Sequence, residues 1–116
     1  MIAVPAGVKV LVATKPVDFR KGAEALLALV RDAGADPFAG TLYVFRSKRK
    51  DRIKIVWWDG SGICLFTKRL DEDGFCWPRL EDGVIRLSSA QLMALVDGME
   101  WTRIHALRRR RPQSLG

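Results

Sequence analysis

The chain has 116 residues, of which 48% are apolar, and its 20 basic and 13 acidic side chains give a formal net charge of +7. This length and apolar content suffice for one domain whose buried core needs neither disulfides nor a structural metal. Two cysteines and one histidine do not supply the ligands of a zinc site, and no apolar run is long enough to span a bilayer. We therefore expect no metal, no cofactor and no membrane span. The first residues lack the pattern of a signal peptide, so we expect a cytoplasmic protein.

Strand patterns rich in β-branched and aromatic residues alternate with two helical patterns along the chain. The first helix is predicted to follow an N-cap at Asp18 and to end at Gly34, and the second to follow Ser88 or Ser89 and to end at Gly98. The predicted strands are 8–13, 41–46, 52–58, 63–70, 75–77 and 84–87. These elements predict a single α+β domain over residues 1–102, with an antiparallel β-meander of about five to six strands packed with two helices. We expect residues 103–116 to form a basic flexible tail.

The two cysteines lie in apolar surroundings in the sequence. Cys64 falls within a predicted strand, and no C-x-x-C motif accompanies it. We expect Cys64 and Cys76 to be reduced, partly buried thiols that act as small hydrophobes, with a disulfide as the alternative.

Positive charge is concentrated in two segments of the chain. Residues 46–69 carry eight basic and two acidic side chains, and residues 102–116 carry five basic and no acidic ones. Between them, residues 70–101 carry two basic and seven acidic side chains. Such segregation favours a polyanionic partner, most often nucleic acid.

The strongest basic feature is a predicted four-residue turn, 47–50, between two strands. The alternation of side chains then places Arg46 opposite Asp51 and gathers the apolar side chains of both strands on one face, which would pack on the helices. The next turn would place Arg52 opposite Arg69 and Lys54 opposite Thr67.

On this register the outer face of the sheet displays arginine and lysine beside Tyr43, Phe45 and Trp58. Like charges opposite one another are destabilising unless an anion lies between them, and interleaved aromatic rings suit base stacking. The candidate nucleic-acid-binding residues are Arg46, Lys48, Arg49, Lys50, Arg52, Lys54, Trp58, Arg69, Arg20, Lys21, Arg108, Arg109, Arg110 and Arg111.

Each of these features also fits an ordinary structural role. Basic side chains protect exposed strands from edge pairing, or they meet the acidic face of a protein partner, and the aromatic rings could be covered by the second helix or by a partner chain. Arg20 and Lys21 could bind phosphate at a helix N-terminus or could pair with an acid such as Asp59. The tail either makes non-specific phosphate contacts or has no role.

Catalysis is not indicated by the sequence. The acidic residues cluster in 71–82, mainly in predicted turns, whereas Asp18, Asp51 and Asp59 are scattered and have turn or capping roles. Metal-dependent DNA cleavage needs about three carboxylates around two metal ions, and the Gly60 and Gly62 pair is better explained as a hairpin turn than as a phosphate loop. We therefore expect that the protein is not an enzyme.

Several longer strings resemble one known family, and they are residues 18–22, 36–45, 51–60, 62–70, 75–78, 87–92 and 98–101. The chain is similar to the short accessory protein (Orf2, or TnpB) of the insertion-sequence-sixty-six family of bacterial transposons, which is distinct from the RNA-guided nuclease that shares the TnpB name. The resemblance spans about residues 1–102, with Glu100 and a slightly longer turn at 71–74 as departures.

The resemblance implies a role in DNA transposition beside a large transposase and a further accessory protein encoded by the same element. We expect a non-catalytic subunit that binds DNA through the basic hairpin and assists the transposase. The alternative is an adaptor that contacts the transposase or the other accessory chain, with the acidic 71–82 segment in its contact surface and no direct DNA contact. A homo-oligomer also stays open.

Overall fold

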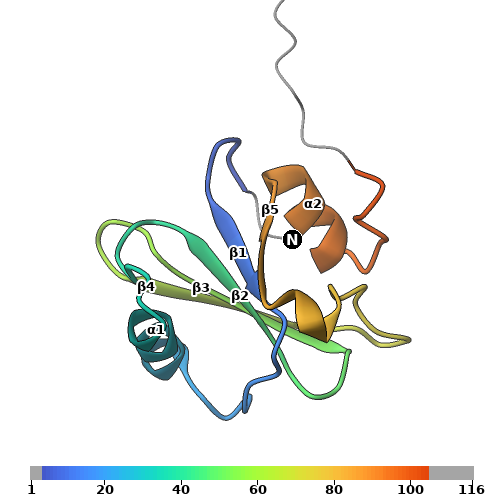
Figure 1. Cartoon of the computed structure of the whole chain (residues 1–116), viewed down its shortest axis with the longest axis horizontal. Helices are drawn as coiled ribbons and strands as arrows, with labels where there is room; N and C mark the ends of the chain where they lie inside the picture. Colours follow the sequence, from blue (N-terminus) through green and yellow to red (C-terminus); the bar gives the residue numbers. More distant parts are fainter. Residues whose placement is uncertain (1–3, 105–116) are drawn as a thin grey trace, which may run out of the picture.

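The computed structural model describes residues 4–104 and contains a five-stranded mixed sheet with one helix on each face (Figure 1). The order of strands across the sheet is β4-β3-β2-β1-β5. No helix in this part of the chain is long and apolar enough to cross a bilayer. The strands are β1 (Val10–Ala13), β2 (Leu42–Arg46), β3 (Arg52–Trp58), β4 (Ile63–Arg69) and β5 (Val84–Leu87), and the helices are α1 (Ala23–Asp32), α2 (Ser89–Val96) and a short 3-10 helix (Leu80–Asp82).

The predicted antiparallel meander is confirmed for β2, β3 and β4, and β1 and β5 also pair in antiparallel fashion. The prediction is wrong for β1 and β2, which run parallel with Val10 beside Leu42. The physical reason lies in the connection between them, because the long segment that contains α1 carries the chain back to the edge where β1 began. The single domain, the two helices and the number of strands agree with the sequence-based expectation.

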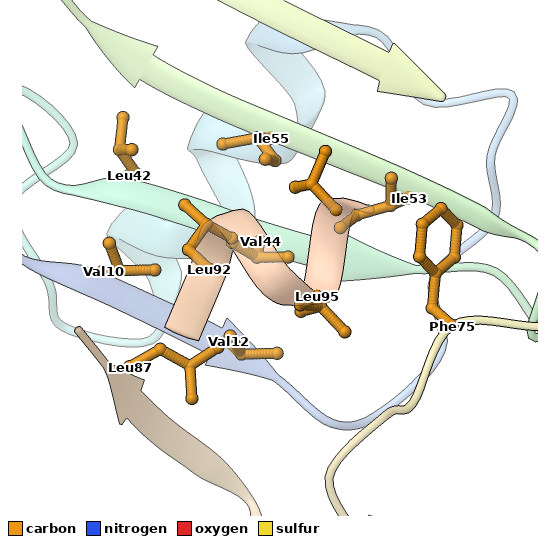
Figure 2. Close-up of a cluster of buried hydrophobic side chains, with 11 residues drawn as sticks. Val10, Val12, Leu42, Val44, Ile53, Ile55, Phe75, Leu87, Leu92 and Leu95 are labelled. Carbon is orange, nitrogen blue, oxygen red and sulfur yellow. The ribbon is translucent and has the colours of Figure 1, made fainter. Parts of the chain in front are cut away.

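The larger core lies between the sheet and α2 (Figure 2). Alternate residues of the three central strands point to this face, as the pleat requires, and two leucines of α2 pack against them. The buried side chains of this core are Val10, Val12, Leu42, Val44, Ile53, Ile55, Phe75, Leu87, Leu92, Leu95 and Val96.

The other face of the sheet is covered by α1, which corrects the expectation that its aromatic residues are exposed. Tyr43 and Phe45 are only 6% and 5% exposed, because the apolar stripe of α1 packs on them. That stripe, Leu26, Leu27 and Val30, needs an apolar surface, and the face that holds Tyr43, Phe45 and Val56 supplies it. The predicted base-stacking surface at Tyr43 and Phe45 is therefore part of the core.

The ends of α2 agree with the prediction, whereas the start of α1 does not. Ser88 caps α2, since its hydroxyl accepts from the backbone N–H of Gln91, and Gly98 follows the helix with φ +75°. The predicted N-cap at Asp18 is wrong, because α1 begins at Ala23 after Gly22. The Asp18 carboxylate accepts hydrogen bonds from Arg20 instead and closes a turn before the helix.

Both cysteines are free thiols, as expected. Cys64 is half-buried in β4, where its Sγ donates to Asp59 Oδ2 at 3.4 Å and burial raises its pKa. Cys76 is exposed rather than partly buried, because it lies in the loop after β4 and not in a strand.

The strand predicted at 75–77 is absent, because this segment packs on the turn between β2 and β3 instead of joining the sheet. The backbone N–H of Phe75 and the indole N–H of Trp77 both donate to the carbonyl oxygen of Lys50, at 2.8 and 3.0 Å. Gly74 approaches the same residue so closely that an added Cβ would lie 2.6 Å from Lys50 Cβ.

We predict that Gly74→Ala destabilises the fold, because the new methyl group would overlap the turn that Gly74 contacts. Forced overlap of this kind lowers the free energy of unfolding by about 1–3 kcal/mol. Gly62→Ala is the matched control, since nothing lies within 4 Å of a Cβ added there. Urea denaturation of both variants measures the difference, and equal stability would contradict the close packing of Gly74 on Lys50.

Candidate nucleic-acid interface

The connection between β2 and β3, residues 47–51, is called the basic turn below. Arg46 pairs with Ile53 and Phe45 with Lys54, so the predicted pairing of Arg46 with Asp51 is wrong by two residues. The shift has a physical reason, because the backbone carbonyls of Lys50 and Asp51 accept from Phe75 and Leu70 and are not used in the β2–β3 ladder. A register shift of two residues leaves each side chain of β2 and β3 on the same face of the sheet. The predicted apolar face is therefore confirmed.

Lys48, Arg49 and Lys50 form the exposed tip of the basic turn. The hydroxyl of Ser47 donates to the carbonyl of Arg49 and shapes the turn. Among residues 4–104, no carboxylate lies within 4.0 Å of these three cations; the ion pairs found there involve Arg20, Arg31 and Arg79. The three charges at the tip are thus left to solvent or to an anionic partner.

A groove of about 690 Å³ lies between the basic turn and the loop that precedes α1. The backbone N–H of Val17 donates to the carbonyl of Arg46 at 2.9 Å and holds this loop against the end of β2. The groove is lined by Pro16, Val17, Asp18, Phe19, Ser47, Lys48, Arg49 and Arg52. Three of these side chains are cationic and one is acidic, so the groove is suited to an anion.

Arg52 and Arg69 face each other across β3 and β4, as predicted. Arg69 is exposed, whereas the Nε of Arg52 is buried without a hydrogen-bond partner, as is Oδ1 of Asp51. Two facing arginines repel each other, and an unpaired buried donor is unfavourable. An anion bound between these guanidinium groups would reduce their repulsion and would accept a hydrogen bond from the unpaired donor.

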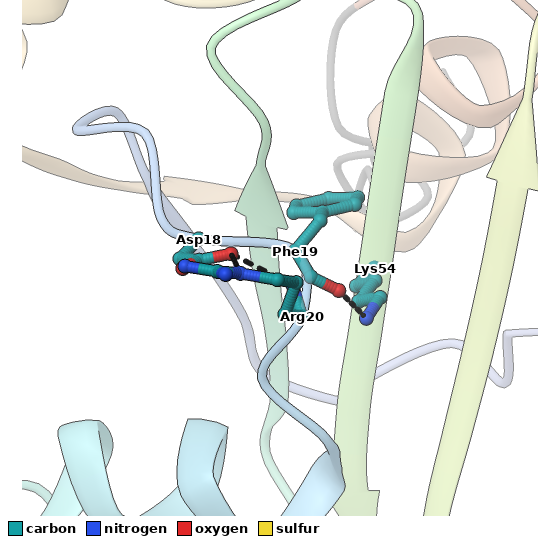
Figure 3. A network of polar contacts seen from close by, with 4 residues as sticks. All are labelled: Asp18, Phe19, Arg20 and Lys54. Atoms are coloured by element: carbon teal, nitrogen blue, oxygen red, sulfur yellow. Dashed lines mark hydrogen bonds and ion pairs between the residues drawn. The ribbon is translucent and has the colours of Figure 1, made fainter.

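Lys54 does not project freely from the sheet. Its Nζ donates to the carbonyls of Phe19 and Lys21 at 2.6 and 3.0 Å and lies 5.0 Å from the centroid of the Phe19 ring (Figure 3). The charge of Lys54 therefore fixes the loop before α1 beside the basic turn. Lys54 therefore acts as a positioning residue, because it holds one wall of the groove in place.

Arg20 and Lys21 lie in the loop before α1 and not in its first turn, because the helix begins later than predicted. Arg20 pairs with Asp18, with Nη2 and Oδ2 2.7 Å apart, and not with Asp59. Asp59 instead accepts from the backbone N–H groups of Ser61 and Gly62, which hold its pKa at about 2.

The remaining predicted residues are placed apart from the tip. Trp58 lies at the far end of β3, six residues or roughly 20 Å from Arg52, and packs edge-on against Phe38. Arg46 is buried on the α2 side of the sheet, where its guanidinium lies over Trp77. The arginines at 108–111 lie outside the described residues.

The structure thus brings the tip cations, Arg52 and Arg69 to one end of the sheet, with the Arg20 and Lys21 loop beside them. The exposed acids Asp71 and Asp73 border this region, because Gly74 contacts Lys50. The sequence missed Trp77 as a neighbour of the turn, since no local pattern signals a contact across 27 positions.

Within residues 4–104, no three His, Cys, Asp or Glu side chains are grouped so that they could hold a metal ion.

Comparison with known proteins identifies relatives along nearly the whole chain. A family model described as IS66 Orf2 like protein matches residues 8–106. Uncharacterized protein y4jC of Sinorhizobium fredii (strain NBRC 101917 / NGR234) is 44% identical over 113 residues, 97% of each chain. Uncharacterized protein y4hO of the same strain is 41% identical over 110 residues, 94% of each chain. No solved structure matches the chain.

The ion pair between Asp18 and Arg20, beside the groove, changes the pKa of Asp18, and this change can be measured. The Arg20 side chain, and then its backbone N–H, lower the pKa of Asp18 from 3.8 to about 2. Because this pKa is lower in the folded state, the stabilisation is complete above the ordinary pKa and is lost as the pH falls toward 2. We predict that Arg20→Ala raises the pKa of Asp18 toward its ordinary value, as followed by NMR titration of the carboxyl carbon.

Lys21→Ala is the control for this titration. Its coulombic effect on Asp18 is the weakest of the causes that act there, so the pKa should move less than in Arg20→Ala. Equal shifts in the two variants would show that net charge, and not the Arg20 hydrogen bonds, sets the pKa of Asp18.

Proposed function

The chain belongs to the IS66 Orf2 like protein family, and on this premise we propose that it is a non-catalytic accessory protein of DNA transposition that binds DNA through the basic turn. The family implies the accessory role in transposition. In the proposed complex, the transposase carries out the chemistry of strand transfer, and this chain contributes contacts to the phosphate backbone.

The observation that carries the proposal is the exposed tip of the basic turn. Lys48, Arg49 and Lys50 are held together by a turn of fixed shape, and no acid in residues 4–104 pairs with them. Holding like charges together is unfavourable without a counter-charge, and a DNA backbone supplies one at regular intervals.

The groove beside the tip supports the same conclusion. Arg52 lines it and faces Arg69 of β4, and the buried Nε of Arg52 has no partner in the described part of the chain. A phosphate oxygen accepts well from paired guanidinium groups. These contacts concern the phosphate backbone and carry no sequence specificity by themselves, which suits a subunit that relies on the transposase for recognition.

A charge-reversal triplet tests the proposal. We predict that Lys48→Glu, Arg49→Glu and Lys50→Glu together weaken binding to duplex DNA by at least roughly tenfold at ~50 mM salt, measured by fluorescence anisotropy. The free energy of unfolding should change by no more than about 0.5 kcal/mol per site, because these side chains are exposed.

The matched control carries the same change of charge elsewhere. Lys9, Arg31 and Arg86 are exposed, and Lys9 precedes β1 at the end of the sheet opposite the basic turn. Their triple replacement by Glu should leave most of the affinity intact. Equal losses in the two triplets would mean that net charge alone attracts DNA, and the assignment of the basic turn would be wrong.

A protein adaptor is the second candidate function, and a different surface favours it. Ile63 and Leu65 of the edge strand β4 are 39% and 41% exposed. A largely apolar groove of about 380 Å³ also lies between α1 and the β1–β5 side of the sheet, with Leu11, Leu29 and Val84 in its lining. Co-purification with the transposase after nuclease treatment, together with absence of DNA binding at ~50 mM salt, would favour this function over the first.

A further inference from the structure

A second concave site lies at the base of the basic turn, on the other face of the sheet from the groove described above. Arg46 pairs with Ile53, whose side chain belongs to the α2 core, whereas Arg52 and Lys54 point to the α1 side. The pocket that contains Arg46, called the Arg46 pocket below, has a volume of about 480 Å³. Its lining includes Pro16, Arg46, Lys50, Cys76, Trp77 and Arg79, and no Asp or Glu lines it.

Arg46 is a buried cation without a carboxylate partner. It is 9% exposed, and among residues 4–104 no acid lies within 4.0 Å of it. Its Nε donates to the carbonyl of Ser47 at 3.3 Å. Burial lowers the pKa of Arg46, but an arginine stays charged at neutral pH. Buried charges are normally paired, so an unpaired guanidinium in a pocket indicates an anionic ligand.

The surroundings hold the guanidinium ready for such a ligand. It lies 5.4 Å from the centroid of the Trp77 ring, and the Trp77 indole N–H is fixed by its bond to the Lys50 carbonyl. A cation–π contact engages the charge of the guanidinium and uses none of its N–H groups for a bond to oxygen, so the terminal N–H groups are left for a planar or tetrahedral acceptor.

Lys50 supplies the second available cation of the pocket. Its side chain is exposed and unpaired in the described part of the chain, while its backbone carbonyl anchors Phe75 and Trp77. Arg79 is engaged by Glu81 and Asp82, at 3.8 and 3.5 Å. Two cations therefore converge on a pocket large enough for a phosphate together with the sugar that carries it.

We propose that the Arg46 pocket binds the terminal phosphate of a nucleic-acid strand. A phosphate within a continuous duplex can contact the exposed tip, whereas Arg46 is a residue only 9% exposed and is recessed in a pocket that suits a narrower group. A strand end can enter the pocket, and its terminal phosphate carries more negative charge than a backbone phosphodiester. This inference rests on the proposed function for its choice of nucleic acid as the source of the phosphate.

The experiment compares single strands of one sequence that end in a 5′-phosphate, a 3′-phosphate or hydroxyls only, each bound to the full chain and measured by fluorescence anisotropy. We expect one of the phosphorylated strands to bind roughly tenfold more tightly than the hydroxyl strand, as a charge-assisted pair of hydrogen bonds would give. Arg46→Lys and Lys50→Gln should each reduce this ratio toward one.

Two control variants separate the pocket from general electrostatics. Lys48 lies on the tip, outside the Arg46 pocket. Lys48→Gln should therefore weaken binding of all strands and leave the ratio between phosphorylated and hydroxyl strands unchanged. Arg86 lies on β5, so Arg86→Gln should change neither the affinity for the strands nor the ratio of affinities. Since Lys50 is exposed, Lys50→Gln keeps the test valid even if the Arg46 variant does not fold.

In a second experiment, inorganic phosphate is added to the full chain, and its binding is followed through the NMR signal of the Trp77 indole N–H. A phosphorylated strand that binds more tightly, with a ratio abolished by Arg46→Lys or Lys50→Gln, supports the proposal. Equal affinity for all strands overturns it, even if duplex binding shows that the proposed function holds. A response to inorganic phosphate without any preference for a phosphorylated strand overturns the assignment to a strand end.

Discussion

The carbonyl oxygen of Lys50 is the contact on which the arrangement of charged residues depends. It accepts from the backbone N–H of Phe75 and from the indole of Trp77, and so fastens the segment after β4 to the basic turn. This contact makes the turn longer than a tight hairpin and keeps its three cations exposed. It also places the Trp77 ring under the guanidinium of Arg46. One backbone acceptor thereby organises both cationic sites, one on each face of the sheet.

The two sites differ in the kind of anion that they suit. The tip and the groove beside it are open, and their cations include exposed side chains and Arg52, which faces Arg69 of β4. Such a surface fits a run of backbone phosphates. The Arg46 pocket is smaller and is lined by one arginine that is only 9% exposed, which fits one phosphate group at a time. A strand whose end lies near the turn could engage both sites, since Pro16 borders each of them.

The strands could be predicted because their signals are local. The bounds of β3 and β5 follow from β-branched and aromatic runs between turn residues, and Ser88 with Gln91 marks the start of α2 through its own hydrogen bonds. The faces of β2 and β3 were also predictable, because a two-residue error in register leaves the alternation intact.

The features that the sequence did not reveal depend on contacts between distant segments. The parallel pairing of β1 and β2 and the burial of Tyr43 and Phe45 both depend on where α1 packs. Asp18 resembles an N-cap in the sequence, but its neighbour Arg20 competes for the same oxygens. The Arg46 pocket requires Trp77, and nothing near either residue in the sequence predicts their cation–π contact.

The dependence of DNA affinity on salt tests the central claim most directly, because each phosphate contact releases condensed counterions. With roughly six such contacts, the logarithm of the association constant should fall against the logarithm of salt with a slope near about −5. Reversal of the three tip charges should make that slope shallower by roughly 3, since three contacts are removed. A slope near zero for the unaltered protein, or the same slope in the tip variant, would contradict the account.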